Sequence, residues 1–160
     1  MPIKSFRWRY VALPLLFLLL SLGLAIYFYP RLPGELAYHF KGGLPDRWLS
    51  RVAVIAWLLV PQFLLTVLGA ALVMGIIRLG NRFPRTTNKR AGKMLLLMGN
   101  MVALPQSVLT FAMLAIFSYN SYGMYLMPLW VFALMVMGLG GIILGAFFFL
   151  AIKQALARKL

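Results

Sequence analysis

Long apolar runs separated by short polar clusters dominate the chain. Residues 10–29 carry no charge and are rich in leucine, and residues 52–77 form a second uncharged run. No charged residue occurs between Met94 and Ile152. A helix needs about 20 apolar residues to cross a hydrocarbon core about 30 Å thick, so this last stretch is long enough for two crossings. The pattern predicts helices near 10–29, 52–77, 94–118 and 125–152.

A polar break at residues 118–123 falls in the middle of the last apolar stretch and predicts the turn between the third and fourth helices. A membrane β-barrel would instead alternate apolar and polar residues at a period of two, whereas these runs are apolar on every side. We therefore expect one all-α domain over residues 1–160, an integral-membrane four-helix transmembrane bundle.

The composition agrees with a chain that lies in lipid. Of its residues 63% are hydrophobic and 11% are charged, against about 45–50% and about 25% in soluble domains. A soluble enzyme, a nucleic-acid-binding domain and a disordered tail are therefore poor fits. Cysteine is absent, which excludes disulfides, thiolate metal sites and a cysteine nucleophile.

The distribution of Lys and Arg predicts the orientation of the bundle, because cytoplasmic segments carry the excess of these residues. One side of a four-pass chain would carry most of them: Lys4, Arg7, Arg9, Arg78, Arg82, Arg85, Lys89, Arg90, Lys93, Lys153, Arg158 and Lys159. The opposite side would carry Arg31, Lys41, Arg47 and Arg51. We therefore expect both termini in the cytoplasm (N-in/C-in).

The net charge of +14 also indicates partners. Basic clusters beside apolar runs favour contact with anionic lipid headgroups, and a cytoplasmic protein partner for the basic loop 78–93 is an alternative. No groove-reading or aromatic-interleaved element accompanies the charge, so we do not expect binding to nucleic acid.

The outer segment 30–51 is the most informative part of the chain, because it holds both acidic residues and the only histidine. Pro30 and Pro33 end the first helix. Gly42 and Gly43 allow a tight turn with positive φ. Asp46 is placed to cap the start of the second helix.

Four spaced residues in this segment carry a resemblance: His39, Phe40, Gly43 and Asp46. With a preceding Leu-Pro and a basic residue at Arg51, they resemble DUF1648, a domain of unknown function found in small bacterial membrane proteins that include the SdpI-type immunity proteins. The resemblance covers about residues 10–60. Ala37 and Lys41 depart from it, where proline and asparagine are usual. The resemblance implies a bacterial plasma (inner) membrane protein and fixes no activity.

The same segment allows several kinds of chemistry. His39, Asp46 and Glu35 are suitable ligands for a cation or zinc, although their spacing is not a recognised zinc pattern. A His–Asp pair is also a general base with its orienting group, but no nucleophile stands out beside it. We favour structural roles, with ligand or partner binding by His39, Phe40, Gly43, Asp46 and Glu35 as the functional alternative. We expect no catalytic residue, cofactor or metal site.

Two apolar runs share the pattern Pro-Gln-x-x-Leu-Thr, which places Gln62 and Thr66 in the second helix and Gln106 and Thr110 in the third. At 1.5 Å per residue both glutamines lie roughly 15–18 Å from the start of their helices, near mid-membrane. Two interpretations stay open. One is a midplane polar site built on a weak inverted repeat, and the other, which we favour, is hydrogen bonding that holds helices together.

These observations lead to two functional hypotheses. The first is a non-enzymatic immunity-like or sensor-like protein whose extracytoplasmic segment 30–51 binds a peptide or protein. The second is a transporter or channel component that uses the midplane glutamines. Homo-oligomerisation is compatible with both, since Gly141 and Gly145 allow close helix approach.

Overall fold

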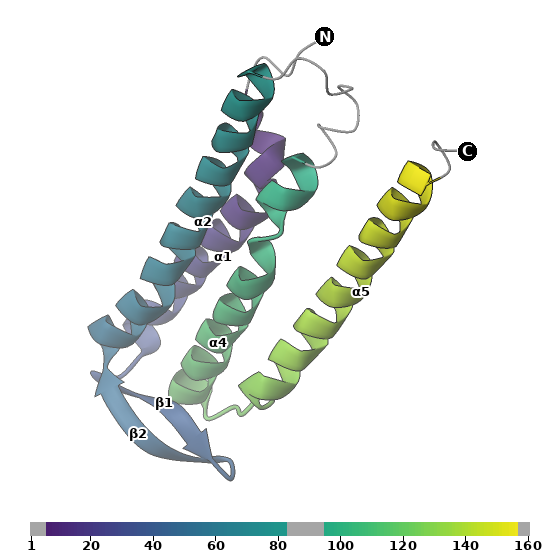
Figure 1. The fold of residues 1–160 in the computed structure, drawn as a ribbon. Helices are drawn as coiled ribbons and strands as arrows, with labels where there is room; N and C mark the ends of the chain where they lie inside the picture. Colours follow the sequence, from purple (N-terminus) through teal and green to yellow (C-terminus); the bar gives the residue numbers. More distant parts are fainter. Residues whose placement is uncertain (1–5, 83–94, 157–160) are drawn as a thin grey trace. The chain divides into compact units, whose positions relative to one another are not determined.

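A computed structural model describes residues 6–82 and 95–156 and is mostly helical (Figure 1). Three of its helical segments are long and apolar enough to cross a membrane: Trp8–Arg31, Arg51–Arg78 and Leu95–Tyr122. They correspond to the first three of the four predicted crossings. Most of the predicted basic loop 78–93 and the N-terminal Lys4 lie outside the described residues.

The first helix, α1 (Ala12–Phe28), is preceded by a short 3-10 turn, Trp8–Val11, and followed by another, Tyr29–Arg31. Pro14 lies in the first turn of α1, where its missing N–H has no helical partner to lose. The N–H of Leu13, one of the orphan donors at this helix end, is bound by the side chain of Asn100 from a distant part of the chain at 2.9 Å.

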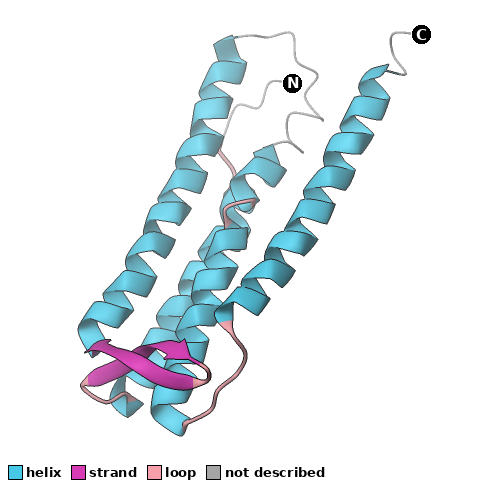
Figure 2. Ribbon diagram, turned by 60° about the horizontal axis from the view of Figure 1, so that its bottom comes forward, coloured by secondary structure: helices cyan, strands magenta, loops and turns pink. Residues whose placement is uncertain are grey.

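The outer segment folds into a β-hairpin, which the all-α prediction did not include. Strand β1 (Glu35–Lys41) pairs antiparallel with β2 (Leu44–Ser50). Gly42 and Gly43 form the turn with φ of 60° and 85°, as expected for a turn that only glycine adopts without strain. Figure 2 shows the hairpin at the ends of the helices of residues 6–126.

Two local expectations are wrong. Asp46 does not cap the second helix, because α2 (Arg51–Arg82) begins five residues later and Asp46 lies within β2. The polar residues 118–122 do not form a turn, because α4 (Ala103–Tyr122) runs through them and ends at Gly123, whose φ is 67°. In both places the polar residues make contacts with the hairpin that are described below. Local sequence patterns do not predict these contacts, because they join residues that are distant in the chain or lie on different strands.

Residues 95–100 are helical and precede α4, from which they are separated by a two-residue turn. This short helix packs closely on its neighbours. A Cβ added to Gly99 would stand 2.1 Å from the carbonyl oxygen of Tyr10 and 2.6 Å from Val73 Cγ2. Only glycine fits at this crossing without a shift of the backbone.

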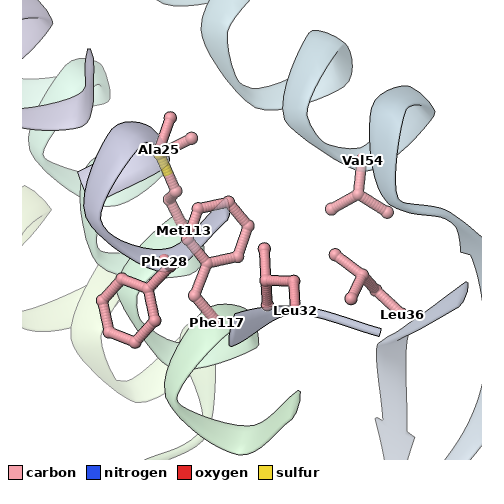
Figure 3. Close-up of a cluster of buried hydrophobic side chains, with 7 residues drawn as sticks. All are labelled: Ala25, Phe28, Leu32, Leu36, Val54, Met113 and Phe117. Carbon is pink, nitrogen blue, oxygen red and sulfur yellow. The ribbon is translucent and has the colours of Figure 1, made fainter. Parts of the chain in front are cut away.

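Two apolar clusters fill the interior of the segment 6–126. The larger lies beneath the hairpin and joins α1, β1, α2 and α4 (Figure 3); its buried members are Ala25, Phe28, Leu32, Leu36, Val54, Met113 and Phe117. The smaller consists of Tyr10, Val11, Val73 and Leu95. The buried polar side chains of α2 and α4 lie between these two clusters in sequence.

Residues 127–160 form a separate unit. Within it, α5 (Leu129–Leu156) begins directly after Pro128, whose carbonyl accepts a hydrogen bond from the N–H of Val131 at 3.1 Å. Its described portion from Leu129 to Ile143 is apolar. The fourth crossing remains a prediction.

Candidate functional site

A buried polar network lies between three helices. Its members are Ser21 of α1, Gln62 and Thr66 of α2, and Gln106 and Thr110 of α4. Ser21, Gln62 and Gln106 are completely buried, and the two threonines are nearly so. The structure therefore brings together all four residues of the two Pro-Gln-x-x-Leu-Thr motifs and adds Ser21, which the repeated motif did not indicate.

Hydrogen bonds join the two motifs directly. The side-chain nitrogen of Gln106 donates to the carbonyl oxygen of Gln62 at 2.9 Å and to Thr66 Oγ1 at 2.8 Å. Gln62 Oε1 accepts from Ser21 Oγ at 2.8 Å and from Thr110 Oγ1 at 3.3 Å. Because each bond crosses between helices, the network fixes how α1, α2 and α4 are registered on one another.

The threonine hydroxyls also bond within their own helices. Thr66 Oγ1 donates to the carbonyl oxygen of Gln62, and Thr110 Oγ1 donates to that of Gln106, each at 2.9 Å. The same turn of each motif is thus used in the same way on two antiparallel helices. Together with the hydrogen bonds between helices, which interhelical packing predicts, these contacts give the repeated motif a structural reason.

Two amide atoms of the network have no partner among the described residues: Gln62 Nε2 and Gln106 Oε1. Turning the Gln62 amide over would let its nitrogen donate to Ser21 and Thr110. The side-chain oxygens of Gln62 and Gln106 would then both lack a donor. In either orientation Gln106 Oε1 can still accept a hydrogen bond. No ionisable side chain takes part in the network, so it lacks the usual parts of a proton relay.

The hairpin is attached to the helices by Asn120, near the end of α4. Asn120 Oδ1 accepts from the main-chain N–H of Ala37, and Asn120 Nδ2 donates to the carbonyl oxygen of Ala37, both at 2.9 Å. A second bond from Nδ2 to the carbonyl oxygen of Ile116, at 2.8 Å, orients the amide. Asn120 therefore pairs with β1 as a neighbouring strand would.

Arg51 holds the other end of the hairpin. Its guanidinium donates to the carbonyl oxygens of Tyr29 and Leu32 at 3.2 and 3.1 Å and lies over the Tyr29 ring at 4.2 Å. Its main-chain N–H donates to the carbonyl oxygen of Gly34 at 2.8 Å. The basic residue singled out by the resemblance thus closes the start of α2 onto the end of α1.

The outward side of the hairpin carries the only ion pair among the described residues. His39 Nδ1 donates to Asp46 Oδ1 at 2.5 Å across the two strands, and both side chains are exposed to solvent. This hydrogen bond, together with the charges of His39 and Arg47, holds the pKa of Asp46 below its ordinary value of 3.8. The predicted contact between His39 and Asp46 is present.

The remaining candidates of the segment are spread along it. Phe40 packs edge-on against Tyr119 of α4 at 4.7 Å between ring centroids. Gly43 supplies the turn, and Glu35 pairs with Ser50 at the far end of the strand from His39. No three His, Cys, Asp or Glu side chains of residues 6–82 and 95–156 are grouped to hold a metal. The three-ligand alternative is therefore not assembled in this part of the chain.

Sequence reasoning missed the two asparagines that connect distant segments. Asn120 lies in the segment predicted as a turn, and Asn100 lies in the predicted third helix, where the sequence does not indicate its partners. Asn100 Nδ2 donates to the carbonyl oxygen of Arg9 at 3.2 Å, opposite the bond that its Oδ1 makes with Leu13. The available signal was an isolated amide in an apolar surrounding, which must find a partner in the protein.

Three apolar helices long enough to cross a membrane indicate a membrane protein. A β-hairpin packs against one end of these helices. Residues 16–61 match the family described as Domain of unknown function (DUF1648). The resemblance carried by His39, Phe40, Gly43 and Asp46 is therefore confirmed, and the chain contains this domain. The match spans most of α1, the whole hairpin and the first part of α2. No curated protein and no solved structure matches the chain.

Proposed function

We propose that this chain is a bacterial plasma-membrane protein that crosses the bilayer four times, with α5 as the fourth crossing and both termini in the cytoplasm. The excess of Lys and Arg on the side of the termini supports this orientation. The hairpin then faces the extracytoplasmic side. Reporter fusions that placed the two termini on different sides of the membrane would contradict the orientation.

We further propose that the protein acts without catalysis and binds an extracytoplasmic peptide or protein through residues 30–51, in the style of an immunity or sensor protein. The observation that carries this proposal is the contrast within the hairpin. Asn120 and Arg51 fix its main chain, while Tyr38, Trp48 and the His39–Asp46 pair are exposed. A surface that is ordered before binding loses less conformational entropy when a ligand binds.

Survival of a sensitive bacterium exposed to peptides secreted by competing bacteria tests this proposal. Expression of the wild-type chain should increase survival against at least one such peptide. The double variant Tyr38→Ala/Trp48→Ala should lose the protection at an equal level of protein in the membrane. Leu19→Ala, which removes an exposed side chain of α1, is the matched control. Full protection by the double variant would contradict binding through the hairpin.

A transporter or channel component is the second candidate, and the unpartnered amide atoms Gln62 Nε2 and Gln106 Oε1 are the observation that favours it. Such atoms supply hydrogen bonds to a small polar solute at depth. Solute flux into vesicles that contain the purified protein tests it. Gln62→Leu should abolish the solute flux if the network lies on a transport path. If the network only connects helices, the solute flux should be the same with the variant as with the wild type.

A further inference from the structure

The two edges of the hairpin differ. Asn120 occupies both main-chain groups of Ala37, so Ala37 and its partner Trp48 form a pair that is not hydrogen-bonded. Hydrogen-bonded and non-hydrogen-bonded pairs alternate along an antiparallel ladder. The pair of Gly34 and Arg51 lies three positions from the pair of Ala37 and Trp48, and it is hydrogen-bonded, as this alternation requires. The main-chain N–H and C=O groups of Trp48 and Ser50 therefore point to the outer edge of β2, away from β1.

Residues 46–50 are exposed along this outer edge, and the pairing with β1 is regular at residues 48–50, because the register shifts lie between Ala37 and Phe40. Proteins usually protect an edge strand with proline, a covering segment or a bulge that turns the edge away. Here Asn120 covers the β1 edge. The only proline of β2, Pro45, lies next to the turn and so does not protect the edge at residues 48–50. An exposed edge without a paired strand, such as Trp48–Ser50, is the usual site for strand addition by an extended peptide.

We propose that the outer edge of β2 binds an acidic peptide in extended conformation, which adds to the hairpin as a third strand. This inference rests on the proposed function and names the class of ligand. The charge of the hairpin selects an acidic partner, because Arg47 of β2 and Lys41 at the turn end of β1 are exposed and have no carboxylate partner among the described residues. Asp46 is occupied by His39.

A lipid headgroup is the other anionic occupant available at a membrane surface, but it matches the edge less well. A phosphodiester only accepts hydrogen bonds, so it would satisfy the N–H of Trp48 and leave the C=O without a donor. An extended peptide supplies a donor and an acceptor at every second residue. Its acidic side chains would lie beside Arg47 of β2.

Fluorescence anisotropy of a dye-labelled ten-residue peptide of alternating Glu and Val tests the proposal with the full chain in nanodiscs of phosphatidylcholine. We expect binding to the wild type, with affinity at least about tenfold weaker, a change of about 1.4 kcal/mol, when alternate amides are N-methylated or when Lys replaces Glu. Trp48→Pro removes the edge N–H as well as the ring, and Trp48→Ala removes only the ring. The proline variant should bind at least about tenfold more weakly than the alanine variant.

Hydrogen exchange provides an independent measurement. In the free protein the amides of Trp48 and Ser50 should exchange faster than that of Leu49, which lies in the β-ladder, and the peptide should slow the exchange of Trp48 and Ser50 but not that of Leu49. Equal binding of the methylated peptide, no binding up to millimolar concentration, or equal affinities of the two Trp48 variants would overturn strand addition. So would protection of the Trp48 amide by phosphatidylglycerol nanodiscs without peptide, since the lipid would then be the occupant.

The two proposals fail separately. If strand addition fails while Tyr38→Ala/Trp48→Ala still removes protection of cells, the hairpin binds through its side chains and the proposed function stands. If the peptide binds as described but the wild-type chain does not protect cells, the edge is a binding surface and the immunity-like function is wrong.

Discussion

The buried network and the hairpin both depend on side-chain amides but use them for different ends. Gln106 bonds to a main-chain carbonyl and a hydroxyl of another helix, and every member of its network is enclosed. Asn120 bonds to a strand on one edge and leaves the opposite edge free. The network turns polar groups inward to align helices, while the hairpin turns them outward. Burial of a polar group alone therefore does not distinguish a functional site from a packing contact.

The largest effect is expected at the close crossing of Gly99 beside the smaller apolar cluster, outside both the network and the hairpin. Gly99→Ala places a methyl group where Tyr10 and Val73 already stand, at 2.1 and 2.6 Å, and should cost about 1–3 kcal/mol or more of stability. Unfolding in detergent mixtures would measure it. Gly23→Ala, which meets nothing within 4 Å, is the control and should be neutral or slightly stabilising. Equal stability of the two variants would contradict the close crossing.

Removing the amide of the network should have the next largest effect. Gln106→Leu deletes two bonds to α2, and at about 0.6 kcal/mol per bond, with a maximum near 1.7, the loss should total about 1–3 kcal/mol. Thr110→Val loses its bonds to Ser21 and Gln62 and should cost less. A double-mutant cycle of Gln62→Leu with Gln106→Leu measures their coupling, and strict additivity would show that the two amides act independently.

Loss of the hairpin attachment should be local. Asn120→Leu deletes both bonds to Ala37, so the amides of residues 35–50 should exchange at least about tenfold faster. Global unfolding should change less than in Gln106→Leu. Asn120→Asp keeps the acceptor for the Ala37 N–H and loses the donor, so it should give an intermediate rate. Unchanged exchange in Asn120→Leu would mean that Asn120 does not hold the hairpin.

The smallest effect should come from the exposed ion pair. The folded-state pKa of Asp46 is below 3.8, so the contribution of this group to hairpin stability is present above the unfolded value and is lost as pH falls through the folded one. Carboxyl-carbon NMR would follow the titration. His39→Ala should move the Asp46 midpoint back towards 3.8 while leaving the stability of the helices unchanged. An unmoved midpoint would show that His39 is not the cause.

Much of this fold could be predicted because helices long and apolar enough to cross a membrane leave a simple pattern in the sequence. Uncharged runs of about 20 residues locate the spans, and the repeated motif pointed to Gln62 and Gln106 because amides inside apolar helices must find partners in the protein. The turn at Gly42–Gly43 followed from local backbone sterics in the same way.

The parts that could not be predicted depend on contacts between distant segments. Apolar and polar residues alternate only weakly over residues 35–50. The strands in this segment are stabilised by Asn120, more than 80 residues away in the chain. Asp46 has the chemistry of a helix cap but pairs with His39 across the hairpin. The role of Gly99 is visible only when Tyr10 and Val73 are placed beside it. In each case a residue has two locally acceptable roles, and tertiary packing selects one.

Strand β2 passes into α2 without an intervening loop, since Ser50 ends one element and Arg51 begins the next. The joined segment runs without a break from Leu44 to Arg82, with Trp48 in its strand and Gln62 about 16 Å along its helix. A movement of the strand therefore acts directly on the first turn of the helix that bears Gln62. Mechanical coupling between the two ends is thus a property of the connectivity itself and needs no extra segment.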